Sequence, residues 1–225
     1  MQPKHAPGLK NRINMCQGVD GMNLKTSFFD RRSKVSIVHD DSNAAEQLAH
    51  ELLLNIPSVT RRPIVFVCIG TDRSTGDSLG PLVGSILEEK GLQSFYVYGT
   101  LDEPIHAMNL ADKLREINTT HANPYIIGID ACLGRIKSVG VIQVGNGPLK
   151  PGAGVNKELP AVGDIHITGI VNVSGFMEFF VLQNTRLNLV MRMAKTIASG
   201  IVQASLLYPK QNWAELNWIE EEKTN

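Results

Sequence analysis

The sequence predicts a three-layer α/β fold, in which helices cover both faces of a mostly parallel central sheet. Two segments, Pro63–Gly70 and Pro124–Ala131, are almost wholly apolar and rich in β-branched residues, which is typical of strands buried on both faces. Segments with helical spacing of apolar residues alternate with the predicted strands. That alternation indicates parallel strands joined by right-handed helical crossovers.

A single domain accounts for most of the chain. With 225 residues, of which 43% are hydrophobic and 20% charged, the chain is long enough to bury a substantial core. Residues 1–21 are rich in Gly, Pro, Lys and Asn without periodicity, so we expect a disordered leader or extension there. We expect one α/β domain over residues 22–208 and a C-terminal tail over 209–225.

The first predicted elements are a strand and a helix. Lys34–Asp40 alternates apolar and polar residues as a half-buried strand does. Ser42–Ile56 carries apolar residues on one helical face, begins at a capping Ser42 or Asn43, and is stopped by Pro57.

The middle of the chain repeats the unit of strand and helix. After the strand Pro63–Gly70, the apolar spacing predicts a helix over Ser78–Gly91, with Pro81 in its first turn and a glycine at its end. A further strand, helix and strand follow over Ser94–Leu101, Asp102–Asn118 and Pro124–Ala131.

The last part of the chain is less regular. Strands are predicted over Val139–Gly147 and Asp164–Ser174, with a Gly- and Pro-rich loop between them. An apolar-striped segment from Phe176 to about Leu207, broken near Asn184, supplies the closing helices, and Pro209 ends them.

Charge and cysteine content narrow the class of partner. Lys plus Arg and Asp plus Glu both number 22, so no net field attracts nucleic acid or an anionic membrane surface. Three unpaired cysteines argue against a disulfide framework, and no apolar run approaches the roughly 18 residues that span a bilayer. We therefore expect a cytoplasmic protein with no direct nucleic-acid or membrane partner.

Acidic residues follow three successive predicted strands. Asp72 and Asp77 lie in the loop after the first, Asp102 follows the second, and Asp130 ends the third. Ligands of parallel sheets bind outside the carboxyl ends of the strands, so these carboxylates can share a proton, a water or a metal. The alternative is that each caps a helix, which is easiest to argue for Asp102 and hardest for Asp130.

Other catalytic motifs are absent from the sequence. The loop GTDRSTGDS has Asp77 where a phosphate-binding P-loop needs lysine, and no H-E-x-x-H motif occurs. His106 and His166 are the histidines near the predicted site loops. Cys68 and Cys132 lie in apolar strand contexts, where cysteine acts mostly as a small buried hydrophobe.

Three segments carry a resemblance to a known family: Ser74–Pro81, Ile126–Arg135 and Pro151–Val173. Through them, Pro63 to about Gln203 resembles the YyaC-type sporulation proteins of endospore-forming bacteria. More distantly, it resembles the germination protease that degrades small acid-soluble spore proteins. The resemblance implies the phosphorylase/hydrolase-like fold of the hydrogenase maturation peptidases.

The resemblance also implies site residues. It places the two catalytic aspartates of an unconventional aspartic-type peptidase on Asp77 and Asp130. The maturation peptidases bind a metal, and their acids would match Asp77 and Asp102, with His166 a guess for their histidine. Asp72 is a further supporting candidate. No cofactor is expected. A divalent metal is expected only if the protein acts as the metal-dependent maturation peptidases do.

The resemblance and the loop composition together suggest the substrate and the setting. The loop residues Gly152, Gly154, Asn156 and Lys157 are candidates for shaping a cleft for a protein substrate, although a plain surface loop fits their composition equally well. Small acid-soluble spore proteins or another spore protein would be the substrate, in the forespore or spore core. Homo-oligomerisation is left open.

Two further functions remain open at this point. One is a non-catalytic sporulation binding or scaffold protein that kept the peptidase fold. The other is a metal-dependent maturation-type peptidase. A catalytic pair requires the carboxyl oxygens of Asp77 and Asp130 to lie within direct or single-water reach of each other, whereas a relic would show them splayed or salt-bridged, for example Asp77 to Arg73 or Arg135.

Overall fold

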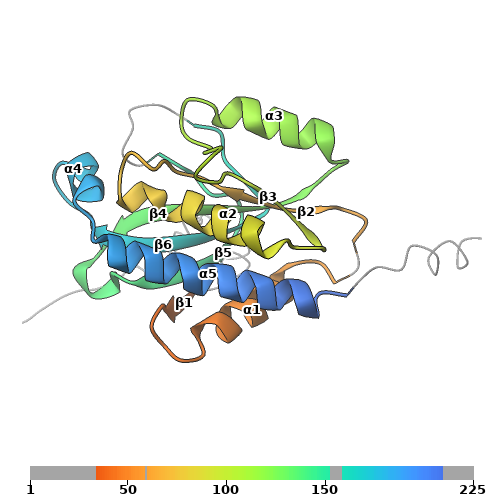
Figure 1. Ribbon diagram of the computed structural model, residues 1–225, viewed down its shortest axis with the longest axis horizontal. Coiled ribbons are helices and arrows are strands. Elements are labelled where there is room, and N and C mark those ends of the chain that lie inside the picture. The colour runs from red at the N-terminus through yellow and green to blue at the C-terminus, as the bar shows by residue number, and fades with distance from the viewer. Residues whose placement is uncertain (1–33, 59, 153–158, 210–225) are drawn as a thin grey trace, which may run out of the picture. The chain divides into compact units, whose positions relative to one another are not determined.

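The computed structural model describes residues 34–58, 60–152 and 159–209, which form alternating strands and helices (Figure 1). In chain order, the elements are β1 (Val35–Val38), α1 (Ala44–Asn55), β2 (Ile64–Cys68), the one-turn 3₁₀ helix η1 (Gly76–Ser78), α2 (Leu79–Lys90), β3 (Phe95–Tyr98), α3 (Leu110–Thr120), β4 (Tyr125–Gly134), the 3₁₀ helix η2 (Ile136–Ser138), β5 (Val141–Asn146), β6 (Ile165–Val173), α4 (Glu178–Gln183) and α5 (Leu187–Leu207).

The strands form one six-stranded sheet in the order β1-β5-β6-β4-β2-β3. The pairs β6-β4, β4-β2 and β2-β3 are parallel, whereas β5 is antiparallel to both of its neighbours. The mostly parallel α/β sheet predicted from the sequence is therefore confirmed, with β5 as its one reversed strand.

Helices cover both faces of the sheet. Figure 1 shows α1, α2 and α5 side by side over one face. Phe66 and Ile127 belong to the larger hydrophobic core, which also contains buried residues of these three helices. On the other face, α3 covers Val65 and Val67 with the buried residue Ile117. Residues alternate between faces along each strand, which explains why β2 is buried at every position.

The helix predicted over Asp102–Asn118 was wrong at its start. α3 begins only at Leu110. The reason is that the preceding segment extends the sheet: Ile105 is buried, forms a parallel bridge with Ile69, and accepts a hydrogen bond from the Gly70 amide at 2.8 Å. A residue paired in the sheet cannot also lie in a helix, so the helix starts later in the sequence than predicted.

The predicted break in the closing helices is confirmed, since α4 ends at Gln183 and α5 starts at Leu187. The expected leader over 1–21 and most of the tail lie outside the described residues, and the domain limits remain predictions. Within the described ranges, no helix combines the length and apolar character needed to span a bilayer.

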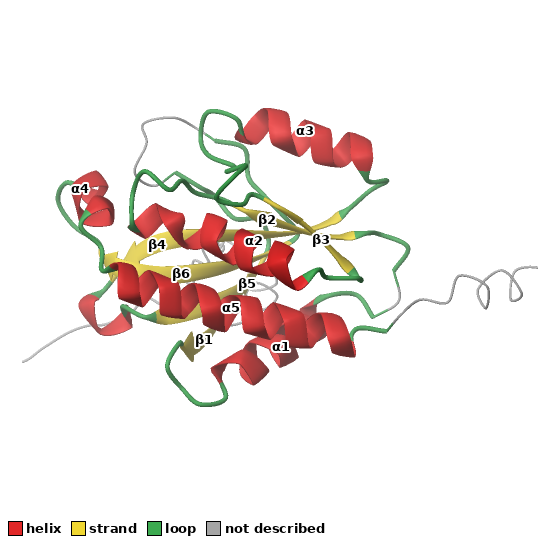
Figure 2. Ribbon diagram, viewed as in Figure 1, coloured by secondary structure: helices red, strands yellow, loops and turns green. Residues whose placement is uncertain are grey.

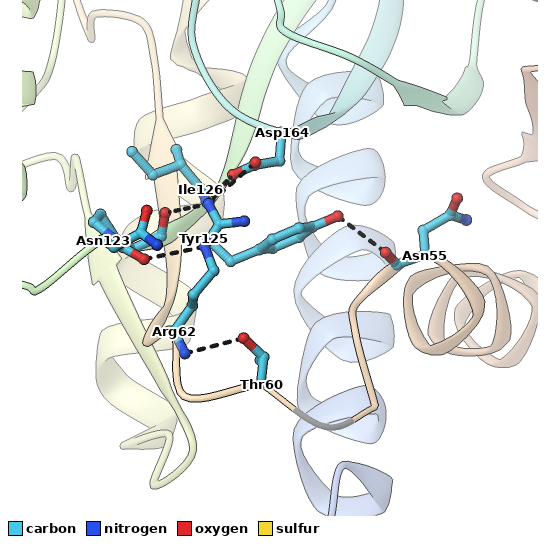
Figure 3. Close-up of polar contacts among 8 residues, drawn as sticks. Asn55, Thr60, Arg62, Asn123, Tyr125, Ile126 and Asp164 are labelled. Atoms are coloured by element: carbon cyan, nitrogen blue, oxygen red, sulfur yellow. Dashed lines mark hydrogen bonds and ion pairs between the residues drawn. The ribbon is translucent and has the colours of Figure 1, made fainter.

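Arg62 fastens the amino-terminal ends of three segments (Figure 3). Its guanidinium donates to the carbonyls of Asn123 and Pro124, at 3.1 and 2.7 Å, and to both oxygens of Asp164, at 3.1 and 3.0 Å. Asp164 in turn accepts from the Ile126 amide at 2.9 Å. The loop before β2 and the starts of β4 and β6 are thereby joined at the end of the sheet where the strands begin.

Replacing Arg62 with lysine is expected to lower the free energy of unfolding by about 1–3 kcal/mol, because a point charge cannot reproduce the planar set of donors. Urea unfolding measures the loss. Arg115→Lys is the matched control, since Arg115 pairs with Asp112 on an exposed helix face and such pairs contribute about 0.5 kcal/mol. Equal losses in the two variants would contradict this role for Arg62.

Candidate active site

The candidate site lies where the parallel strands end. Figure 2 shows the arrowheads of β4 and β6 ending beside α4. Asp77 lies in η1, which follows the loop after β2 and leads directly into α2. Asp130 lies on β4, beyond the last residue that pairs with β2. Two neighbouring strands therefore deliver one carboxylate each to the same end of the sheet.

A close backbone approach holds the Asp77 loop in place. Gly70 has φ +149°, and a Cβ there would lie 1.9 Å from the Asp77 carbonyl oxygen. That carbonyl accepts from the Thr71 amide at 3.1 Å, and the Ser78 amide donates to the Ser74 carbonyl at 3.0 Å. Because Gly70 has no side chain, the loop can fold back over the end of β2.

Asp130 points to the face opposite the larger core. Ile127 and Ile129 face that core, so the alternation of β4 turns Asp130 the other way, as it does Gly128. Asp130 pairs with Thr168 of β6, and its Oδ1 accepts from the Ala131 amide at 2.8 Å. The register shifts just beyond, at Cys132, and such bulges redirect side chains near strand ends.

Both carboxyl groups have a raised pKa, and the charge of Asp77 contributes to the rise at Asp130. Burial is the main cause that raises the pKa of Asp130 to about 8; the Ala131 amide opposes the rise and the charge of Asp77 adds to it. The side chain is partly open to solvent, although protein atoms surround it on most sides. Burial also raises the pKa of Asp77, and the Ser74 hydroxyl lowers it. No arginine is among the causes of either pKa shift. Pairing with Arg73 or Arg135 therefore does not set the pKa of Asp77 or of Asp130.

Asp72 and Asp102 are more exposed than Asp77 and Asp130. Both side chains are exposed. Among the described residues, the Asp72 carboxylate accepts one long contact, from the Thr71 hydroxyl at 3.4 Å. Asp102 lies in the bend before Ile105 and does not cap α3, whose N-cap residue is Asn109. The capping role considered for Asp102 was therefore wrong.

His166 lies on the same sheet face as Asp130 but faces a different neighbour. Its Nδ1 lies 2.9 Å from the Gly147 carbonyl, and its ring covers Gly145, where a Cβ would meet Nε2 at 2.5 Å. In the parts of the chain that the structure describes, no three His, Cys, Asp or Glu side chains form a group that could hold a metal ion. The metal set Asp77, Asp102 and His166 does not fit this arrangement.

The base of the Gly-rich loop lies over β4. Leu149 and Val162 pair through two 2.8 Å backbone hydrogen bonds, and both approach Gly128, two residues before Asp130. Of the loop's predicted cleft residues, Gly152 is half-buried with φ +92°. The other three, Gly154, Asn156 and Lys157, lie outside the described residues.

Sequence reasoning missed several side chains near the pair. Ser74 and Thr168 are buried, and the Thr168 hydroxyl opposes the rise that burial causes in the Cys132 pKa. The segment STGDS carries a signal for Ser74, because it stands three residues before Asp77. The α4 segment also exposes apolar side chains at this end of the sheet, namely Phe176, Met177, Phe179 and Phe180.

Comparison with known proteins identifies the family. Residues 36–200 match the family model described as protein of unknown function, DUF1256. The chain is 58% identical over 182 residues to the uncharacterized protein YyaC of Bacillus subtilis strain 168, covering 80% of this chain and 89% of that protein.

A solved structure offers a more distant similarity. The [NiFe] hydrogenase maturation protease HycI of Thermococcus kodakarensis KOD1 aligns with 64% of this chain and 92% of its own, at 17% identity and a TM-score of 0.44. A similarity of this size says nothing about activity. The match over residues 36–200 and the 58% identity show that the chain belongs to the DUF1256 family.

Proposed function

We propose that this protein is a peptidase in which Asp77 and Asp130 act as a pair that holds one proton. The observation that supports it is that the ends of the neighbouring strands β2 and β4 bring one carboxylate each to the same end of the sheet, where burial and, to a smaller extent, the charge of Asp77 raise the pKa of Asp130 to about 8. Carboxyl groups whose environments push their pKa values apart are suited to acid and base roles at one site. Neither carboxylate caps a helix, so the capping alternative does not account for them.

The two carboxyl groups have different roles in amide hydrolysis. Asp77, as the anion, takes a proton from a water molecule, whose oxygen then attacks the carbonyl carbon of the peptide bond. Asp130, as the acid, donates its proton to the carbonyl oxygen. Collapse of the tetrahedral intermediate breaks the C–N bond. The proton held by Asp77 passes to the leaving amine, and the proton on the diol returns to Asp130.

The substrate proposed is a protein segment, with spore proteins as the favoured class. The resemblance of the segments around Asp77 and Asp130 to the YyaC-type proteins and to the germination protease supports a role in sporulation, in the forespore or spore core. Leu149 and Val162, at the base of the Gly-rich loop, pack against Gly128 on the same sheet face as Asp130.

Cleavage of a basic, unstructured protein tests the proposal. The wild type is expected to cleave it, and Asp77→Asn and Asp130→Asn to lose activity by about 10²–10⁴-fold, the usual contribution of general acid-base catalysis. Asp102→Asn is the control, because that carboxyl is exposed and is not a member of the proposed pair. Equal rates in all four proteins would end the proposal, and binding without cleavage would favour a scaffold.

The pH dependence of cleavage is expected to be bell-shaped. Activity falls above about pH 8, where Asp130 loses the proton that it must donate. It falls again at acidic pH, where Asp77 becomes protonated and can no longer act as the base. A profile of kcat/KM against pH, which reports the pKa values of the free enzyme, measures both limbs. A rate that keeps rising above pH 9 would contradict the acid role of Asp130.

A further inference from the structure

The Ser74 hydroxyl is a buried polar group whose hydrogen-bonding capacity is not used by the described fold. Ser74 is 5% exposed, and its Oγ is buried with no hydrogen bond of regular geometry to any described residue. A buried polar group without a partner costs about 1–3 kcal/mol, so such groups are uncommon. The Ser74 hydroxyl is close enough to the Asp77 carboxylate to lower the pKa of Asp77.

The local backbone fixes Ser74 and Asp77 on one helical turn. The Ser78 amide donates to the Ser74 carbonyl at 3.0 Å, which closes a turn over residues 74–78. Side chains three residues apart on such a turn are neighbours. The turn is clamped on its other side, since a Cβ on Gly76 would lie 2.7 Å from Leu182 of α4.

A second serine on the same turn behaves differently. Ser78 is as buried as Ser74, at 6%, but its hydroxyl donates to the Thr75 carbonyl at 2.7 Å. Its hydrogen-bonding capacity is already used within the turn. Of the two buried hydroxyls, only that of Ser74 is free among the described residues to donate to the carboxylate.

We propose that Ser74 is a positioning residue, whose hydroxyl donates to the Asp77 carboxylate and thereby keeps Asp77 as the anionic member of the pair. The proposal rests on the function proposed above and adds which carboxylate receives the proton. A donor to one carboxylate oxygen also fixes the rotation of the group, so that the other oxygen can face a water molecule. Asp130, whose side chain accepts only from the adjacent amide among the described residues, is left as the proton holder.

Neighbouring charges do not provide the same bias. The elements packed against η1 are β4, α2, α4 and α5. Their titratable groups are Tyr125, Asp130 and Cys132 on β4, Glu88, Glu89 and Lys90 on α2, Glu178 on α4, and Arg192 and Lys195 on α5. None of them lowers the pKa of Asp77; the Ser74 hydroxyl does.

Carboxyl titration by ¹³C NMR tests the proposal without requiring a substrate. Ser74→Ala is expected to raise the pKa of Asp77 by about one unit, the size of a hydrogen bond to a charged group. Ser78→Ala is the matched control and should leave the pKa of Asp77 unchanged. Ser74→Thr, which keeps the hydroxyl, should restore the wild-type titration. The acid limb of the kcat/KM profile should move with the pKa of Asp77.

The outcomes separate this proposal from the proposed function. An unchanged pKa of Asp77 in Ser74→Ala would overturn the positioning role, and so would an equal shift in Ser78→Ala. Loss of cleavage in Ser74→Ala with an unchanged Asp77 titration would overturn it in favour of direct action of the hydroxyl on the substrate. Absence of cleavage by the wild type would end the peptidase proposal alone, because the titrations would still decide the role of Ser74.

Discussion

Asp130→Asn is expected to make the protein more stable while removing the proposed peptidase activity, with a gain in stability that grows as the pH rises. The variant replaces a carboxyl whose pKa is about 8 by a group that cannot ionise. Asparagine can keep the hydrogen bond that Oδ1 accepts from the Ala131 amide. A residue kept at a cost to stability is typical of a functional site.

The direction of this pH dependence follows from the number of protons bound by the folded and the unfolded states. The unfolded chain ionises this carboxyl near its ordinary pKa of about 3.9, whereas the folded protein holds the proton up to about pH 8. Below the lower value both states are protonated, and the contribution to stability is fully present. Between the two values the folded state binds more protons, so the free energy of unfolding falls as the pH rises, by up to about 1.4 kcal/mol per pH unit.

Urea unfolding at pH 5 and at pH 8 measures this effect. The difference between Asp130→Asn and the wild type should be larger at pH 8 by a few kcal/mol. Asp102→Asn, at an exposed carboxyl, should follow the wild type at both values. A variant no more stable than the wild type at pH 8 would mean that burial does not penalise the ionised form of Asp130.

Gly84→Ala is expected to destabilise the protein by about 3 kcal/mol, the upper part of the range for overpacking. Gly84 lets α2 approach the sheet so closely that a Cβ would lie 2.0 Å from the Gly99 carbonyl oxygen. One turn earlier, Gly80 meets the Ile69 carbonyl in the same way, at 2.1 Å. Because these neighbours are backbone atoms, the helix must move, and Asp77 lies at its start.

Gly175→Ala is the control for that substitution, since no atom lies within 4 Å of its Cβ position. Alanine in place of helical glycine would by itself add about 1 kcal/mol of stability, so a loss in Gly84→Ala isolates the clash. Thermal unfolding of both variants gives the comparison. Equal melting temperatures would show that α2 has room to shift.

Local patterns were sufficient to predict most of the fold. Buried strands such as β2 and β4 consist of long apolar runs, and Pro57 and Gly91 end helices by backbone chemistry alone. The start of α3 could not be predicted, because it depends on the pairing of Ile105 with a strand 36 positions earlier at Ile69. Long-range pairing of this kind leaves no local periodicity.

The candidate site, too, could be predicted only in part from the sequence. The convergence of strand ends in a parallel sheet, a property of the fold class, indicated Asp72, Asp77, Asp102 and Asp130 as candidates. The family resemblance then singled out Asp77 and Asp130. Asp102 and His166 could not be placed, because the bend at Asp102 and the ring contact of His166 with Gly145 are set by tertiary packing. Ser74 could be suspected from its spacing, but its unpartnered hydroxyl is visible only in three dimensions.

The titration of Asp130 tests the central claim most directly. ¹³C NMR of the carboxyl groups should give Asp130 a pKa of about 8 in the wild type and a lower pKa in Asp77→Asn, where the neighbouring negative charge is gone. An Asp130 carboxyl that titrates near 4, and does so equally with and without the Asp77 charge, would show that the two groups do not form a pair.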